Sequence, residues 1–122
     1  MKYIALVYYR EQIMNDMSQQ EWDALNQECI AGVEKLVADG KMLDGAPLLS
    51  VDTATTVRVR EGRITTTDGP FAETREQLAG FYLLEARDLN EAIQLGGRIP
   101  TARYGSIEVR PVRELRAEDN ER

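Results

Sequence analysis

One stretch marks the place where the chain must leave a sheet: Thr66-Thr67-Asp68-Gly69-Pro70-Phe71-Ala72-Glu73-Thr74. The Asp68 side chain can accept a local backbone hydrogen bond, and Gly69 tolerates a positive φ. Pro70 fixes the next φ and removes one backbone donor. Because strand-like sequence precedes and follows it, the stretch must take the chain out of a sheet. We expect a turn here, and we expect any functional site to lie near it.

Strand-like segments lie on both sides of this turn. Before it, Thr55–Arg60 and Arg63–Thr67 alternate in character about Glu61-Gly62, which predicts a β-hairpin. Earlier still, Lys41–Leu49 is a strand candidate that contains a glycine and a proline, so we expect an edge strand. After the turn, Leu78–Ala86 is strongly apolar and predicts a buried strand.

The N-terminal third predicts a central strand and a helix. Lys2–Tyr9 is apolar on both faces, as expected of a central strand. Ser18 and Glu21 have the spacing of a capping box, and Gly40 is placed to end the helix that begins there. The apolar residues between them recur at steps of three and four: Trp22, Leu25, Cys29, Val33, Leu36 and Val37. We interpret Cys29 in this stripe as a small buried hydrophobe, with a catalytic thiol as the alternative.

The C-terminal third predicts a second helix, a last strand and a tail. Asp88 and Glu91 indicate a helix start, and Pro100 ends the helix. The residues expected to face inward on this helix are Leu89, Ala92, Ile93 and Gly96. Tyr104–Val112 alternates as a strand does. The chain from Arg113 to Arg122 is almost all charged or small, so we expect a domain over residues 1–112 and a solvated tail over 113–122.

The predicted order is strand, helix, strand, hairpin, strand, helix, strand. This order predicts an α+β, ferredoxin-like fold, with two βαβ halves and a hairpin inserted between them. Both helices would cover one face of an antiparallel sheet. The other face would keep apolar side chains that a single chain of this size cannot cover, so we expect a homodimer.

Composition excludes several classes of function. The chain has 122 residues, a net charge of −6, one cysteine and no histidine. The negative charge disfavours nucleic acid, and no segment has the length of a membrane span. A lone cysteine gives no intrachain disulfide and favours a reducing cytoplasm. Without histidine, acid-base chemistry would need a perturbed carboxylate, a tyrosine or Cys29. Histidine-based metal sites are excluded, which leaves only ions with oxygen ligands, and we expect no metal site and no cofactor.

Three groups of residues are candidates for a site. The Asp68 turn is either structural, with Phe71 filling the core, or a binding element. In the segment from Arg98 to Ser106, Arg98 could contact the last carbonyls of the helix and Arg103 a surface carboxylate, or the segment could bind a ligand. Of Tyr8 and Tyr9, one must face the helices and the other the opposite side. The remaining carboxylate groups, Glu73 with Glu76 and Glu118 with Asp119 and Glu121, have the pattern of solvated faces.

Several local strings resemble those of one family. They are the segments from Thr53 to Arg60, from Thr67 to Tyr82 and from Ile99 to Pro111, with Asp68-Gly69-Pro70-Phe71 at the centre. In these the chain resembles the DGPF-type YCII-related proteins. The resemblance implies a dimeric α+β barrel with small-molecule clefts, and a bacterial setting linked to stress responses or sigma factors. The related YciI branch carries a histidine–acid dyad, which this chain cannot form.

These considerations give one leading hypothesis and two alternatives. The leading hypothesis is a homodimer that binds a small molecule, with Tyr8, Asp68, Phe71, Arg103 and Tyr104 as the binding residues. The first alternative is a lyase or isomerase that acts on a small oxygenated acid, with Asp68 as base and Arg103 on the substrate carboxylate. An arginine nearby would lower the pKa of that base, which ranks the enzyme second. The other alternative is a protein-interaction module.

Overall fold

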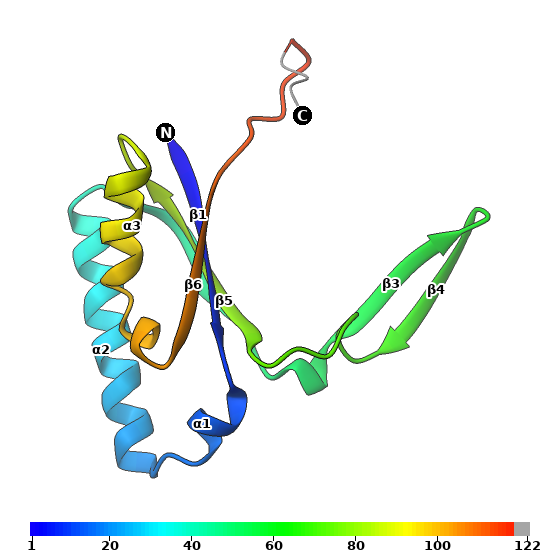
Figure 1. Cartoon of the computed structure of the whole chain (residues 1–122), viewed down its shortest axis with the longest axis horizontal. Coiled ribbons are helices and arrows are strands. Elements are labelled where there is room, and N and C mark those ends of the chain that lie inside the picture. The colour runs from blue at the N-terminus through cyan, green and yellow to red at the C-terminus, as the bar shows by residue number, and fades with distance from the viewer. Residues whose placement is uncertain (119–122) are drawn as a thin grey trace.

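A four-stranded antiparallel sheet forms the body of the protein in the computed structural model, which describes residues 1–118 (Figure 1). Its strands are β1 (Lys2–Tyr9), β2 (Met42–Pro47), β5 (Gln77–Glu85) and β6 (Gly105–Pro111). They follow the order β2-β5-β1-β6, and all neighbouring strands are antiparallel. The central position of β1 and the edge position of β2 confirm the prediction from their apolar pattern and their glycine and proline.

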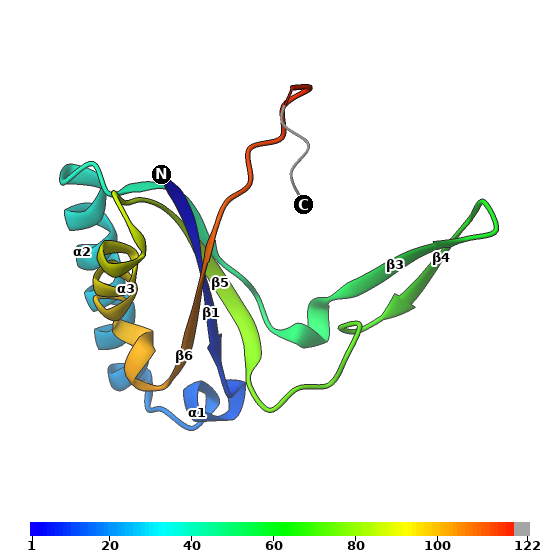
Figure 2. The same cartoon turned by 45° about the horizontal axis from the view of Figure 1, so that its top comes forward.

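Helices α2 (Gln19–Ala38) and α3 (Leu89–Gly97) both cover the same face of this sheet (Figure 1, Figure 2). Element order and strand order together make the fold α+β and ferredoxin-like, as the sequence predicts. The sequence did not predict helix α1 (Glu11–Asn15) or the 3₁₀ turns η1 (Val51–Thr53) and η2 (Pro100–Arg103). Each is too short to show an apolar period.

The core lies between the sheet and the two helices. Strand β1 contributes Tyr3, Ala5 and Val7, and β5 contributes Leu84, which is fully buried. On α3 the prediction of the inward face was partly wrong. Ala92 and Gly96 are buried as expected, with Leu95, but Leu89 and Ile93 are about half exposed at 50% and 51%. A helix of nine residues makes little more than two turns, so the apolar pattern did not distinguish the two sides.

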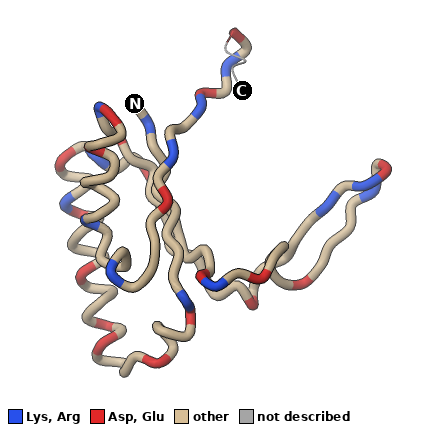
Figure 3. The backbone as a smooth tube through the Cα atoms, viewed as in Figure 1, with Lys and Arg blue, Asp and Glu red and all other residues tan. Residues whose placement is uncertain are grey.

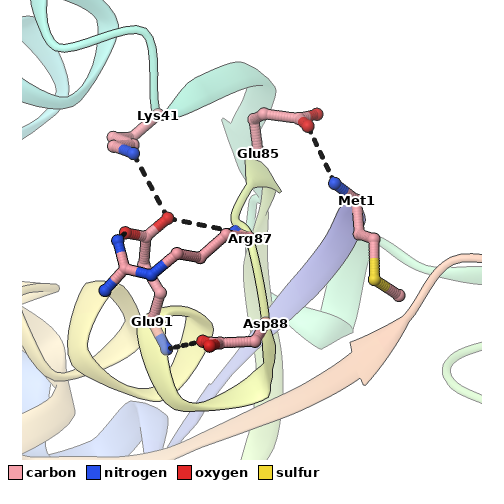
Figure 4. Close-up of polar contacts among 6 residues, drawn as sticks. All are labelled: Met1, Lys41, Glu85, Arg87, Asp88 and Glu91. Atoms are coloured by element: carbon pink, nitrogen blue, oxygen red, sulfur yellow. Dashed lines mark hydrogen bonds and ion pairs between the residues drawn. The ribbon is translucent and has the colours of Figure 1, made fainter.

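Both long helices begin at the predicted caps. The Ser18 hydroxyl accepts the Glu21 amide at 3.1 Å, and the Glu21 carboxylate accepts the Ser18 amide at 3.0 Å, which completes the capping box. At α3, Asp88 accepts the Glu91 amide at 2.9 Å (Figure 4). The Glu91 carboxylate then accepts the Arg87 amide at 3.1 Å and Lys41 Nζ at 3.2 Å. This ties α3 to the residue that precedes β2.

The inserted hairpin stands apart from the body. Strands β3 (Thr55–Arg60) and β4 (Arg63–Asp68) pair only with each other among the described strands, in a separate two-stranded sheet. Glu61 and Gly62 both have positive φ, 52° and 74°, which is the backbone of the hairpin turn that the sequence predicts. We call residues 55–68 the arm. It projects from the lower end of the body, on the side away from the helices (Figure 1, Figure 2).

Residues 113–118 follow β6 and are exposed. The Lys2 amine lies 3.7 Å from the Glu114 carboxylate. The rest of the predicted tail, with Asp119 and Glu121, lies outside the described residues. Within residues 1–118, no helix combines the length and the apolar character that crossing a membrane requires.

Candidate functional site

A cavity of about 530 Å³ lies between helix α2 and the strands β1, β2 and β5. Its walls are mainly apolar. From the helix come Trp22, Leu25, Ile30 and Val33, and from the strands and the residues after β2 come Val7, Met42, Ala79, Leu48 and Leu49. The apolar stripe predicted for the helix therefore faces a hollow for part of its length. This explains why Trp22 is still 36% exposed.

Six polar residues line the cavity: Tyr9, Asn26, Cys29, Glu34, Tyr82 and Thr101. Alternation along β1 puts Tyr9 on the helix side together with Val7, and Tyr82 reaches the same side because it pairs with Ala5. Cys29 comes from the predicted stripe of α2 and is half-buried. Among the described residues that line the cavity, none is a lysine or an arginine.

Burial keeps the acidic hydroxyls and the thiol of this cavity protonated. Desolvation raises the pKa of Tyr9, and the neighbouring Glu11 raises it further. Desolvation likewise raises the pKa of Tyr82 and of the Cys29 thiol. Neither tyrosine hydroxyl has a hydrogen-bond partner among the described residues. The cavity therefore offers neutral donors to a ligand and no cation.

Arg103 and Tyr104 lie beside this cavity without lining it. Both terminal nitrogens of Arg103 contact the Glu28 carboxylate at 2.7 Å, and its guanidinium lies 5.3 Å from the centre of the Tyr104 ring. This ion pair lowers the pKa of Glu28 and raises that of Arg103. Pairing with a surface carboxylate was one of the two interpretations of Arg103. Arg98 was expected to contact the last carbonyls of its helix. Its guanidinium instead lies 3.8 Å from the Asp39 carboxylate.

Tyr8, Asp68 and Phe71 lie elsewhere. Tyr8 is on the sheet face opposite the helices, where it pairs with Ser106 and Leu78. Asp68 ends β4 and is exposed. Phe71 is 80% exposed, so the interpretation of Phe71 as a core residue was wrong. No polar partner holds Asp68 within residues 1–118, and the turn is closed instead by the Gly69 amide, which donates to the Ala54 carbonyl at 2.8 Å.

The cavity thus contains none of the five residues predicted from the sequence. Tyr9 was a candidate together with Tyr8, but Tyr8 was the one predicted to bind. Tyr82 and Glu34 were missed because each lies in an element whose pattern is explained by packing. The sequence carried one usable signal. Adjacent tyrosines at a strand end must face opposite sides, and the one that shares a side with Val7 faces the helices.

Known proteins resemble this chain in sequence and in fold. A sequence model described as the YCII-related domain matches residues 1–116. An uncharacterized protein of Rhizobium meliloti strain 1021 is 37% identical over 114 residues, which cover 92% of each chain. The fold resembles 5-chloro-2-hydroxyhydroquinone dehydrochlorinase (TftG) of Burkholderia phenoliruptrix AC1100, solved in complex with 2,5-dihydroxybenzoquinone. That similarity has a TM-score of 0.58 at 15% identity and covers 94% of this chain and 96% of the other. The family match over nearly the whole chain and the related sequence agree with the resemblance in the sequence motifs: this chain belongs to the family of YCII-related domain proteins.

Proposed function

We propose that this protein binds a small, uncharged and largely apolar molecule with oxygen substituents in the cavity beneath α2. One observation carries the proposal. The cavity wall is apolar, and the hydroxyls of Tyr9 and Tyr82 are protonated and free to bond a ligand. Concave apolar sites with a few convergent polar groups are the usual form of small-molecule sites.

The ligand class follows from charge. Because none of the described residues lining the cavity is Lys or Arg and Glu34 is present, a carboxylate would meet no counter-ion and one acidic neighbour. A hydroxyl or carbonyl group would find donors. TftG was solved with 2,5-dihydroxybenzoquinone, a six-membered ring with oxygen substituents, which supports a ligand of this shape by analogy of fold alone; the uncharged state is inferred from the cavity.

The enzyme alternative has less support. It required Asp68 as base and Arg103 as carboxylate partner, but Asp68 lies on the arm and Arg103 is held by Glu28. Turnover in the cavity would have to use a protonated tyrosine as acid or Glu34 as base. A bacterial stress or regulatory pathway and the DGPF branch remain part of the proposal. The related protein of R. meliloti supports the bacterial setting.

We also propose that the protein acts as a homodimer joined through the sheet face that no helix covers, which we call the free face. By alternation this face carries Ile4, Leu6, Phe81 and Leu83, which are only half-buried in one copy. A biological interface here should bury more than about 1,000 Å² in total. Light scattering should give the mass of a dimer at micromolar concentration, and the mass of a monomer would contradict it.

The ligand proposal is tested with paired probes. Thermal shift and calorimetry should detect neutral dihydroxybenzenes and reject the benzoic acids with the same hydroxyl pattern. Tyr82→Phe should weaken binding by about threefold to tenfold, the value of one hydrogen bond. Tyr104→Phe, outside the cavity, is the matched control and should leave affinity unchanged. Preferential binding of the acids, or equal binding by wild type and Tyr82→Phe, would overturn the proposed site.

A further inference from the structure

The arm has two chemically different faces. Val57 pairs with Thr66 and Val59 with Ile64, so the three aliphatic side chains share one side of the ribbon, which we call the apolar face of the arm. Arg58, Arg60 and Arg63 lie on the other side by the same register. The aliphatic residues are 60%, 58% and 73% exposed. Such an amphipathic ribbon is typical of a β-hairpin whose apolar face packs against another protein surface.

The base of the arm is fixed, although its strands pair only with each other among the described strands. The Glu11 carboxylate accepts the Ser50 hydroxyl and the Val51 amide, both at 2.9 Å, at the entrance to the arm. The Thr56 hydroxyl donates to the Gly69 carbonyl at 2.8 Å at the exit. The arm is thus held out from the body in a definite direction. A two-stranded hairpin alone is marginally stable in water, so its apolar face needs a partner.

We propose that the arm of each copy packs against the body of a second copy of this chain, and we call this contact the clasp. The arm leaves the body on the same side as the free face (Figure 1, Figure 2). A copy docked on that face would therefore lie beside the arm. Six-residue strands extend about 20 Å, whereas two stacked sheets lie about 10 Å apart. The arm is long enough to pass the sheet of the second copy and reach its helix layer.

The free face alone is smaller than the surface that a stable dimer usually buries. Four strands of about seven residues give a plane of roughly 19 Å by 23 Å, or about 440 Å². A standard stable interface buries about 800 Å² on each partner. Sheet packing alone supplies little more than half of that. Two arms, one from each copy, would supply the remainder and give a closed, two-fold arrangement.

Charge favours a second copy over another partner. The arm carries three arginines and one glutamate near its tip, in a chain whose net charge is −6. Figure 3 shows basic residues near the tip of the arm and acidic residues along the N-terminal half of α2. That half contains Glu21 and Asp23, in addition to Glu28, which is already paired with Arg103. The rest of each copy is therefore attractive to the other copy's arm, whereas the net charge opposes nucleic acid.

Contact between copies is tested first with a spin label. The label is placed at Thr65→Cys on the arm, in a Cys29→Ser background, and this protein is mixed with ¹⁵N-labelled wild type that carries no label. Amide signals of the body should broaden in the ¹⁵N-labelled copy, since only the arm of another chain can reach it. Mixed samples with no broadening at concentrations where a dimer is present would overturn the clasp.

The second test uses matched arm variants of the full chain. Val57→Ser, Val59→Ser and Ile64→Ser together should raise the dissociation constant of the dimer at least tenfold. The control, Thr65→Ser with Thr67→Ser on the other face, should leave it unchanged. An unaltered dimer in the triple variant would refute the clasp and leave the sheet interface standing. A monomeric wild type whose arm instead binds duplex DNA would also refute the clasp. None of these outcomes decides whether the cavity binds a ligand.

Discussion

Asp68 is the residue for which sequence motif and structure differ most. The motif drew attention to it, but its carboxylate is exposed and no polar group within residues 1–118 holds it. We predict that Asp68→Asn leaves the melting temperature within about 3 °C, because surface changes without partners usually cost less than 0.5 kcal/mol. Calorimetry of both proteins checks this. A large loss of stability would show that the charge supports the turn.

Cys29 gives a second prediction at this scale. Desolvation and the neighbouring Glu28 raise the pKa of its thiol, so the reactive thiolate is scarcer than in a free cysteine at neutral pH. A thiol reagent should label the native protein slowly. The rate should rise about tenfold per pH unit while the pH stays below the thiol pKa. A cavity ligand should slow it further. Rapid labelling that is independent of pH would revive the nucleophile interpretation.

Glu91 links pH to stability. Its pKa is lowered, first by the hydrogen bond from the Arg87 amide and then by Lys41. A carboxylate with a depressed folded pKa stabilises the fold above its unfolded pKa, and this contribution is lost as pH falls through the folded value. Glu91→Gln should therefore lower the melting temperature at pH 7, and its deficit should shrink below about pH 4. Glu108→Gln is the control, and a deficit independent of pH would contradict the assignment.

At the scale of elements, the helix caps can be tested directly. Helix α2 carries one wall of the cavity and begins at the reciprocal Ser18–Glu21 bonds. Ser18→Ala should cost about 1 kcal/mol, or roughly 3–6 °C in melting temperature. Gln20→Ala, at an exposed position in the first turn, should change little. If both variants melt together with wild type, the cap does not limit the stability of the helix.

The elements also show what the sequence could and could not predict. Caps, turn residues and alternation act over a few neighbouring residues, which is why Ser18, Asp88 and the Glu61-Gly62 turn were predicted correctly. The cavity depends on how α2 lies over β2 and β5, which no local pattern encodes. Tyr9 and Tyr82 therefore read as packing residues. The exposure of Phe71 was missed for the same reason, since an aromatic after a turn looks identical whether or not a core lies beneath it.

At the scale of the whole molecule, the sheet has one face in the core and one face that no helix covers, and β5 places adjacent leucines on the two sides. Leu84 is fully buried under the helices, and Leu83 lies on the free face. Leu84→Ala should lower the free energy of unfolding by about 2–5 kcal/mol, the usual cost of a cavity in a core. It should keep the dimer, so its melting temperature should still rise with protein concentration, as that of the wild type should. Leu83→Ala should instead weaken the dimer. At low protein concentration its free energy of unfolding should fall by less than that of Leu84→Ala, and its melting temperature should depend much less on protein concentration than that of the wild type. Melts of all three proteins across a hundredfold range of concentration make the comparison. Curves for wild type and Leu83→Ala that show the same concentration dependence would mean that the free face is not where two copies meet.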